Sequence, residues 1–277
     1  MKRIISLIIV IVAAFMFTIP LSAAEKGIVK VDVYINGEKL QTTDTPRIIN
    51  DTTYVPLRAV CELFGADDIS WDGRTNTAKI NARGIEIYVT TGKTYIIANG
   101  RYFASTQPIK NIDDRLYVPV RLIASAFDSD VEWNGNNYSV RIKDYNRAPT
   151  SGEEYYDKND LYWLSRIIEA ESGIEPFMGK IAVGNVIQNR VRSSEYPSTI
   201  YGVIFDKKFG VQFTPAASGS IYNTPREDSV IAAKICLEGF SLNEDVLYFM
   251  NPKLATSSWI SENREFAFNI GGHDFYY

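Results

Sequence analysis

The sequence predicts an α+β protein of two domains. An internal repeat of short strands and one helix fills the first half, whereas helical segments precede short strands in the second half. A polar stretch over residues 144–160 separates the halves and shows no apolar period. With 277 residues, the chain is long enough for each half to bury a core of its own.

Residues 1–24 are typical of a secretory signal peptide. Lys2 and Arg3 give a short basic start, residues 4–17 are almost wholly apolar, and Ala23 and Ala24 offer a cleavage site. We therefore expect a secreted protein that is cleaved after one of these two alanines. An uncleaved membrane anchor is the alternative.

Composition excludes several classes of site and partner. Loss of the signal leaves 27 basic against 33 acidic side chains, so no basic surface for nucleic acid is expected. The single histidine, His273, excludes His-rich metal sites, and two cysteines, Cys61 and Cys236, are too few for a disulfide scaffold. We expect a monomer without metal or cofactor.

An internal repeat organises residues 28–143. The segment 53–58 recurs as 116–121, and the segment 69–73, which contains a tryptophan, recurs as 131–135. The two offsets are nearly equal, which indicates two copies of one unit, in which a helix opens at a proline and strands follow. Helices are expected over 55–64 and 118–127, and strands over 71–80, 85–89, 95–97 and 133–142.

Three helices and a few strands are expected in residues 161–277. The helix over 177–191 has so little polar surface that it should be central and buried. The last helix opens at Thr224 with a capping box to Glu227 and closes at Gly239. The other expected elements are a helix over 161–172, a strand over 246–250 and short extended pieces in 266–277.

Glu171 lies on the apolar stripe of the first of these helices. The apolar residues that share its face precede it by seven, four and three positions: Leu164, Ile167 and Ile168. Glu169 lies on the other side and is expected to face water. A carboxyl group against an apolar wall stays protonated closer to neutral pH, as a general acid requires. The alternative is a helix-end glutamate held by backbone N–H groups.

Several ordered blocks of the second half form a family pattern. They are IEAESGIEP at 168–176, GKIAVGNVIQNRV at 179–191, YPSTIYGVI at 196–204, QFTP at 212–215, LYFMNP at 247–252 and IGGHDFY at 270–276. Together they resemble the spore cortex-lytic, SleB-like cell wall hydrolases. The resemblance implies a lysozyme-like or lytic-transglycosylase-like catalytic domain over residues 161–277, in the wall or spore envelope of a Gram-positive-type bacterium.

The resemblance also implies a reaction. In that family, one glutamate at the end of the first helix does the acid and base work, and by motif it is Glu171. It would protonate the glycosidic oxygen between N-acetylmuramic acid and N-acetylglucosamine of a peptidoglycan strand. It would then accept a proton as the muramic 6-hydroxyl closes onto C1, so no second carboxylate is needed. A muramidase that uses water and a non-catalytic peptidoglycan-binding protein are the alternatives.

Five residues are candidates for binding the glycan. Gln212 and Phe213 lie in a stretch expected to form a loop over a cleft, where Gln212 either binds an acetamido group or stabilises a turn. Tyr248, Asn251 and Trp259 fit a saccharide site, because aromatic faces stack on sugar rings and amides pair with hydroxyl groups. One of Tyr248 and its neighbour on the strand is expected to face the core.

Ser172, Glu175 and His273 are expected to support the site. Glu175 precedes Pro176 and is therefore pushed out of helical geometry, which favours a loop-bracing role. As an alternative, His273 and Cys236 would form the thiol–imidazole pair of a cysteine peptidase. Because Cys236 is interior to a helix, it is expected to be a small core residue, and His273 is expected to brace the last strands.

The repeat of residues 28–143 resembles the copper amine oxidase N-terminal-like domain of secreted Gram-positive proteins. The region has no histidine and only Cys61 as a soft ligand, so no copper is expected. Cys61 falls at a position where the second copy has a small residue, which predicts a core site. A spacer or a wall-attachment module is the expected role.

Overall fold

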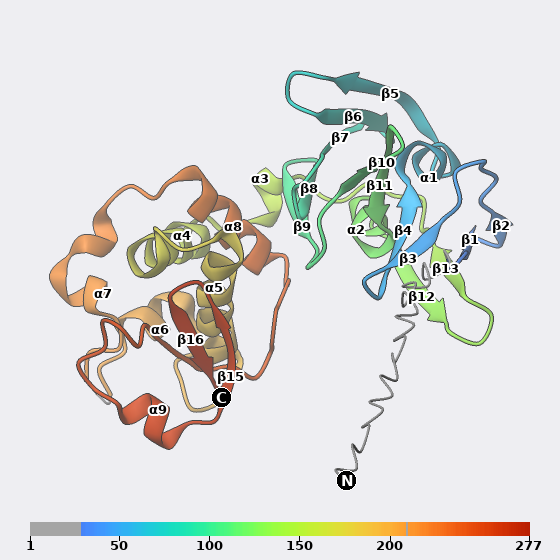
Figure 1. Ribbon diagram of the computed structural model, residues 1–277. Helices are drawn as coiled ribbons and strands as arrows, with labels where there is room; N and C mark the ends of the chain where they lie inside the picture. The colour runs from blue at the N-terminus through green and yellow to red at the C-terminus, as the bar shows by residue number, and fades with distance from the viewer. Residues whose placement is uncertain (1–28, 209) are drawn as a thin grey trace, which may run out of the picture.

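The computed structural model describes residues 29–208 and 210–277, and the predicted signal peptide lies outside them. Strands dominate the first domain and helices the second, with α3 (Gly152–Tyr155) between them in the view of Figure 1. The predicted two-domain α+β fold is confirmed. In the described part of the chain, no helix is long and apolar enough to cross a bilayer.

The two copies of the repeat form equivalent elements. The proline that was predicted to lie in the first turn of each helix is instead the last residue of a strand and the N-cap of the helix. Its backbone is extended, with ψ of 122° at Pro56 and 129° at Pro119. Both helices therefore begin two residues later than predicted. The first copy holds β1 (Asp32–Ile35), β2 (Glu38–Lys39), β3 (Arg47–Ile49), β4 (Thr52–Pro56), α1 (Leu57–Leu63), β5 (Ala66–Asp72) and β6 (Thr77–Ala82). After β7 (Ile85–Thr90), the second holds β8 (Tyr95–Ala98), β9 (Arg101–Ala104), β10 (Lys110–Ile112), β11 (Arg115–Pro119), α2 (Val120–Ala126), β12 (Asp130–Asn134) and β13 (Ser139–Lys143).

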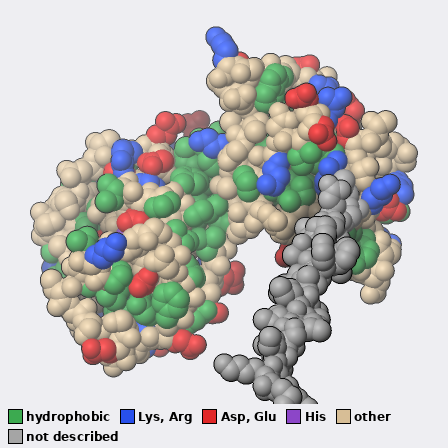
Figure 2. Space-filling model, in the orientation of Figure 1, with side chains coloured by type: hydrophobic (Ala, Val, Ile, Leu, Met, Phe, Trp, Pro, Cys, Tyr) green, Lys and Arg blue, Asp and Glu red, His purple; other side chains and the backbone are tan. Residues whose placement is uncertain are grey.

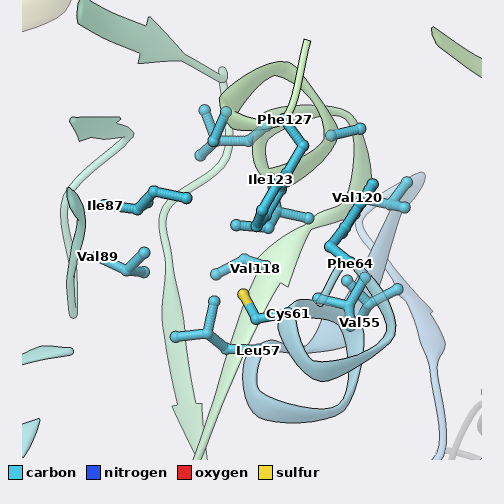
Figure 3. Close-up of a cluster of buried hydrophobic side chains, with 14 of the residues drawn as sticks. Val55, Leu57, Cys61, Phe64, Ile87, Val89, Val118, Val120, Ile123 and Phe127 are labelled. Atoms are coloured by element: carbon cyan, nitrogen blue, oxygen red, sulfur yellow. The ribbon is translucent and has the colours of Figure 1, made fainter. Parts of the chain in front are cut away.

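An approximate two-fold axis relates the copies. Strands β4 and β11 pair antiparallel with Val55 opposite Val118, its equivalent in the other copy. Phe64 and Phe127 are also equivalent, and their rings stack with centroids 4.1 Å apart and planes 6° apart. Figure 3 shows these residues in one core, together with Cys61, which is fully buried as predicted. The copies therefore share a single core.

The outer sheets of the first domain each combine strands from both copies. One has the order β12-β13-β1-β2, in which β1 pairs in parallel with β13, from Asp32 opposite Ser139 to Ile35 opposite Ile142. The other has the order β5-β6-β7-β8-β9, with β7 inserted where the copies meet. The middle sheet has the order β10-β11-β4-β3. Exchange of strands makes the two copies inseparable.

The second domain is a helical core beside a small sheet. The predicted central helix is confirmed as α5, which contacts α4 and α8 and buries Ile181, Val183 and Ile187. The sheet has the order β14-β16-β15. The elements are α4 (Lys158–Ser172), α5 (Phe177–Arg192), α6 (Ile200–Phe205), α7 (Thr214–Ser218), the 3₁₀ helix η1 (Ser220–Tyr222), α8 (Glu227–Leu237), β14 (Tyr248–Met250), α9 (Trp259–Asn263), β15 (Phe266–Ile270) and β16 (His273–Tyr276).

The starts of α4 and α8 differ from the predictions. Helix α4 begins three residues early, because the side chain of Asp157 caps it by accepting from the N–H groups of Asn159 and Asp160. The predicted capping box of α8 is not formed, since the N-cap is Arg226 and no side chain caps the helix. The backbone N–H of Arg226 donates to Glu169 Oε2 instead, at 3.4 Å.

Glu169 does not face water as predicted. Its Oε1 lies 3.0 Å from the Nε of Arg226, and its Oε2 accepts a hydrogen bond from Ser229 Oγ at 2.6 Å. The side chain is 20% exposed. The N-terminal end of α8 supplies both partners, as its N-cap Arg226 and as Ser229, so Glu169 joins α4 to α8.

The polar stretch predicted as a linker packs against the first domain. The backbone N–H of Gly152 donates to the carbonyl of Asn99 at 2.8 Å, and the side-chain amide of Asn99 donates to the carbonyl of Pro149. At Gly152 a Cβ atom would lie 2.3 Å from the carbonyl oxygen of Gly100, so only glycine fits there. The connection is therefore an ordered contact between the domains.

A buried polar cluster, here called the interdomain clamp, consists of Arg101, Tyr156 and Glu238. The Nε and Nη2 of Arg101 on β9 donate to the two carboxylate oxygens of Glu238, beyond the end of α8, at 2.9 and 2.6 Å. The Tyr156 hydroxyl donates to Glu238 Oε1 at 2.6 Å and accepts from the backbone N–H of Tyr102. Figure 2 shows hydrophobic side chains gathered on the second domain where it faces the first. These contacts fix the relative position of the two domains.

Gly184 of α5 permits close packing of α4 and α8. A Cβ atom there would lie 2.6 Å from Cys236 Sγ and 2.8 Å from Ile168 Cδ1. We expect Gly184→Ala to lower the free energy of unfolding by about 1–3 kcal/mol, because an extra methyl group overpacks the core. Urea denaturation measures the loss. Adding Cys236→Ala should recover part of it, and equal losses in the single and double variants would contradict this packing.

Candidate active site

A cleft of about 990 Å³ opens on the second domain. It brings together eight of the nine residues predicted for the site, from the end of α4, the segment before α7, strand β14, helix α9 and strand β16. The ninth, Ser172, is buried behind the wall of the cleft. Residues that are far apart in sequence therefore face one open space.

Glu171 lies in the last turn of α4, in the wall of the cleft. Leu164, Ile167 and Ile168 on the same helix are fully buried, as the predicted apolar stripe requires. Within the described residues, the Glu171 carboxyl group forms no hydrogen bond or ion pair. Burial raises its pKa to about 7. At neutral pH the group is therefore divided between its acid and base forms and can both donate and accept a proton.

Hydrogen bonds of two buried side chains, Ser172 and Lys180, hold the C-terminal end of α4. The hydroxyl of Ser172 donates to the carbonyl of Ile168 at 2.6 Å. The fully buried Lys180 of α5 donates from Nζ to the carbonyl of Gly173 at 2.7 Å and to the hydroxyl of Ser229 at 3.1 Å. Sequence reasoning missed Lys180, and its only signal was a cation within an otherwise apolar helical pattern. These bonds fix the turn that follows Glu171.

Glu175 also lies in the cleft wall, and the loop between β15 and β16 holds its carboxylate. Its Oε2 accepts from the backbone N–H of Gly272 at 2.8 Å, and its Oε1 lies 4.0 Å from Nδ1 of His273. At Gly271, with φ of +61°, a Cβ atom would come within 2.1 Å of Glu175 Oε2. Burial lowers the pKa of His273, although Glu175 and Asp274 oppose this shift, so the imidazole is neutral at pH 7. Such contacts fit bracing roles for Glu175 and His273.

A pair of substitutions tests the bracing role of Glu175. Glu175→Ala removes the acceptor of the Gly272 N–H, so we expect the free energy of unfolding to fall by about 1–3 kcal/mol. Glu175→Gln keeps a carbonyl oxygen there, and we expect a smaller loss and nearly full activity. Thermal unfolding and glycan cleavage, measured on both variants, check these expectations. A stable but inactive Glu175→Gln variant would make Glu175 a second catalytic carboxylate.

Aromatic side chains line another part of the cleft. The rings of Tyr248 and Trp259 meet edge to face with centroids 6.4 Å apart, and the guanidinium of Arg264 lies over both. Trp259 is 51% exposed, so much of its side chain stays accessible beside Arg264. Phe249 packs instead against His273 and the core of the domain. Thus Tyr248 and Phe249 take different surroundings, as expected for neighbours on a strand.

The remaining predicted binding residues differ in accessibility. Phe213 lines the cleft but is buried, so it contributes an apolar floor. Gln212 lines the cleft, and its Nε2 also donates to the carbonyl of Gly210 at 3.4 Å. The side-chain oxygen of Asn251 accepts from the backbone N–H of Lys253 at 3.0 Å, which leaves its Nδ2 for other partners. The contact with Gly210 fits the turn-stabilising role of Gln212, and the binding of an acetamido group by Gln212 stays a prediction.

Arg190 is a cleft residue that sequence reasoning missed. Its Nε donates to the carbonyl of Leu247 at 2.8 Å, and its guanidinium lies 4.9 Å from the ring centroid of Tyr196 and 5.5 Å from that of Tyr248. Burial lowers the pKa of the guanidinium. Its Nη1 is buried without a hydrogen-bond partner in the described part of the chain. Arg190 thus joins α5 to the segment that leads into β14.

The cysteine peptidase alternative finds no support in the structure. Cys236 is buried, its Sγ donates to the carbonyl of Ile181 at 3.5 Å, and burial raises the pKa of its thiol. His273 lies instead beside Glu175. Among residues 29–208 and 210–277, no group of three His, Cys, Asp or Glu side chains could hold a metal ion.

Comparison with known proteins identifies both domains. Residues 34–142 match the family model described as copper amine oxidase N-terminal domain, and residues 174–276 match the one described as cell wall hydrolase. Both resemblances predicted from the sequence are confirmed.

Similar proteins match through the second domain. A spore cortex-lytic enzyme from Bacillus cereus is 38% identical over 120 residues, which cover 43% of this chain and 45% of the relative. A spore cortex-lytic enzyme from Bacillus subtilis is 32% identical over 125 residues, which cover 45% of this chain and 40% of the relative. The chain thus spans less than half the length of these curated relatives.

A solved structure is also similar. The catalytic domain of the germination-specific lytic transglycosylase SleB from Bacillus anthracis is 38% identical, with a TM-score of 0.41, and the match covers 44% of this chain and 97% of that one. Residues 174–276 are thus similar to the cell wall hydrolase family, and residues 34–142 are similar to the copper amine oxidase N-terminal domain family.

Proposed function

We propose that this protein cleaves the glycan strands of peptidoglycan between N-acetylmuramic acid and N-acetylglucosamine, as a lytic transglycosylase. The observation that carries the proposal is Glu171, a carboxyl group in the wall of a large cleft that has no hydrogen-bond partner among the described residues and whose pKa burial raises to about 7. The similar proteins are described as spore cortex-lytic enzymes and as a lytic transglycosylase.

The geometry supports a mechanism in which one residue moves the proton twice. Protonated Glu171 donates to the glycosidic oxygen, and the bond from that oxygen to C1 of the muramic residue breaks as positive charge develops at C1. The resulting carboxylate takes the proton of the muramic 6-hydroxyl as that oxygen attacks C1. A 1,6-anhydro ring forms and no water is consumed. Glu171 ends protonated, ready for the next strand.

Two further features support the use of a single carboxylate. Besides Glu171, two carboxylates of the described residues line the cleft: Glu175, which the backbone N–H of Gly272 already holds, and Glu195, which is exposed. The exposed indole of Trp259 would stack on a sugar ring, and the Nδ2 of Asn251 would donate a hydrogen bond to it. These groups would place the glycosidic bond beside Glu171.

We also infer that the protein works outside the cytoplasm, at the cell wall or the spore envelope, as a secreted monomer. The signal peptide expected over residues 1–24 supports export, and the descriptions of the relatives as spore cortex-lytic support the location. The N-terminal domain would attach the enzyme to the wall.

The products of the reaction test the proposal. The protein is incubated with purified peptidoglycan, and the released muropeptides are identified by mass spectrometry. Products with 1,6-anhydromuramic ends are expected. Reducing ends would show that water is the nucleophile, as in a muramidase, and binding without any release would indicate a non-catalytic peptidoglycan-binding protein.

A further inference from the structure

The N-terminal domain contains two clefts at equivalent positions of its repeat. The first, here called the Trp71 cleft, has a volume of about 520 Å³. Pro56, Arg58 and Trp71 of the first copy line it, together with Asp114 and Arg115 of the second copy. Because the copies exchange strands, the cleft forms where one copy meets the other.

The second, here called the Trp133 cleft, has a volume of about 670 Å³. Pro119, Arg121 and Trp133 of the second copy line it, together with Asp51 and Thr52 of the first. Each of these five residues is equivalent, in the alignment of the two copies, to one of the five residues named for the Trp71 cleft. The approximate two-fold axis therefore builds the same cleft twice.

Both tryptophans present their rings to solvent in the same way. Trp71 is 50% exposed and Trp133 is 41% exposed, so neither serves as a core residue. In each copy the indole Nε1 lies beside a glycine two residues later, where a Cβ atom would be 3.6 Å away at Gly73 and 3.4 Å away at Gly135. An exposed ring held in one place by its own turn is a stacking surface for a flat ligand face.

The Trp133 cleft has a second exposed ring beside it. Tyr138 lies edge-on to Trp133, with centroids 6.1 Å apart. Its φ of +50° is in the left-handed region, where the first copy has Asn76 with φ of +52°. Asparagine tolerates this conformation, whereas tyrosine adopts it at a cost. An exposed aromatic side chain is thus kept at a strained position next to the cleft.

The charges of the clefts favour a neutral polar ligand. The Trp71 cleft balances Arg58 and Arg115 against Asp44 and Asp114, of which Arg115 and Asp44 lie 3.4 Å apart. The Trp133 cleft balances Arg121 against Asp51. A polyanion or a polycation would meet a like charge in either cleft. Hydroxyl and acetamido groups, in contrast, pair with donors and acceptors of both kinds.

We propose that the Trp71 and Trp133 clefts are two saccharide-binding sites, separate from the catalytic cleft, that hold N-acetylated glycan strands of peptidoglycan. The choice of this saccharide rests on the proposed function of the second domain. Phe240 of the second domain also lines the Trp133 cleft, so a strand bound there lies against the junction of the domains.

Sedimentation with purified, insoluble peptidoglycan tests the proposal. The full chain carries Glu171→Gln to prevent turnover, and Trp71→Ala and Trp133→Ala are added singly and together. We expect each single change to raise the dissociation constant by about 2- to 10-fold, and the double change to raise it by at least the product. Tyr145→Ala is the control, because Tyr145 is an exposed aromatic residue just beyond the end of the same domain and outside both clefts. Circular dichroism verifies that all variants fold.

Binding of the double variant that equals binding of its parent would overturn the proposal, as would an equal loss in the Tyr145→Ala control. A second assay separates this proposal from the proposed function. With Glu171 restored, the double variant should cleave soluble glycan fragments at an unchanged kcat. If the wild type cleaves no glycan but the Trp71→Ala, Trp133→Ala double variant still binds peptidoglycan more weakly, the proposed activity is wrong. The assignment of the two clefts as saccharide-binding sites then still holds.

Discussion

Glu171→Gln is expected to lower the rate of muropeptide release by about 10²–10⁴-fold or more, with the fold unchanged. An amide neither protonates the glycosidic oxygen nor accepts the proton of the muramic 6-hydroxyl. Mass spectrometry of the released products measures the rate, and circular dichroism verifies the fold. Retained activity in this variant would contradict the assignment of Glu171 as the catalytic acid.

The same residue makes activity and stability depend on pH. Cleavage needs the acid form first, so the rate should fall as pH rises above the pKa of about 7. In the unfolded chain, the carboxyl group titrates near its ordinary value of 4.5. Since the pKa is raised on folding, the stabilising contribution of the protonated group is complete below pH 4.5 and is lost as pH rises through 7.

The titration of Glu171 should change the free energy of unfolding by a measurable amount. The difference of about 2.5 pKa units corresponds to roughly 3 kcal/mol. Relative to Glu171→Gln, the wild type should therefore lose up to about 3 kcal/mol of unfolding free energy between pH 4.5 and pH 8. Urea denaturation of both proteins at the two pH values provides the measurement. A constant difference between them would mean that Glu171 has an ordinary pKa.

Arg101→Ala is expected to lower the free energy of unfolding by about 3–5 kcal/mol, because it leaves the charge of Glu238 buried without its partner. The side chains of Arg101 and Glu238 are 13% and 4% exposed. We also expect the 144–157 stretch to become sensitive to proteases as the domains separate. Chemical denaturation and limited proteolysis measure the two effects.

An exposed ion pair of the same domain provides the control for the interdomain clamp. Arg58 and Glu62 lie 3.7 Å apart, with side chains 67% and 57% exposed. Arg58→Ala should therefore cost less than about 1 kcal/mol. Replacing both members of the buried pair, as Arg101→Met with Glu238→Leu, should recover much of the loss. If Arg101→Ala costs no more than Arg58→Ala, the clamp does not hold the domains together.

Local sequence patterns predicted much of the fold and of the site. The repeated proline and tryptophan segments placed both copies, and helical spacing placed Glu171 against an apolar face. Glu169 was misassigned because helical periodicity describes a helix in isolation, whereas its partners Arg226 and Ser229 come from α8.

The missed residues share one physical cause. The roles of Lys180 and Arg190 depend on backbone carbonyls of other segments, and no pattern within α5 points to those carbonyls. The packed linker escaped prediction for the same reason, since its polar residues contact β9 and α8. Tertiary hydrogen bonds thus account for the differences.

The exchange of strands between the copies also sets the order in which the N-terminal domain can fold. Strand β1, the first to leave the ribosome, has to wait for β13, the last strand of the domain, before it finds its parallel partner. Each outer sheet is incomplete until both copies are present. Pairings this distant in sequence close slowly. Stable folding of the domain therefore follows synthesis through residue 143, so neither copy completes its outer sheets while the other is still being made.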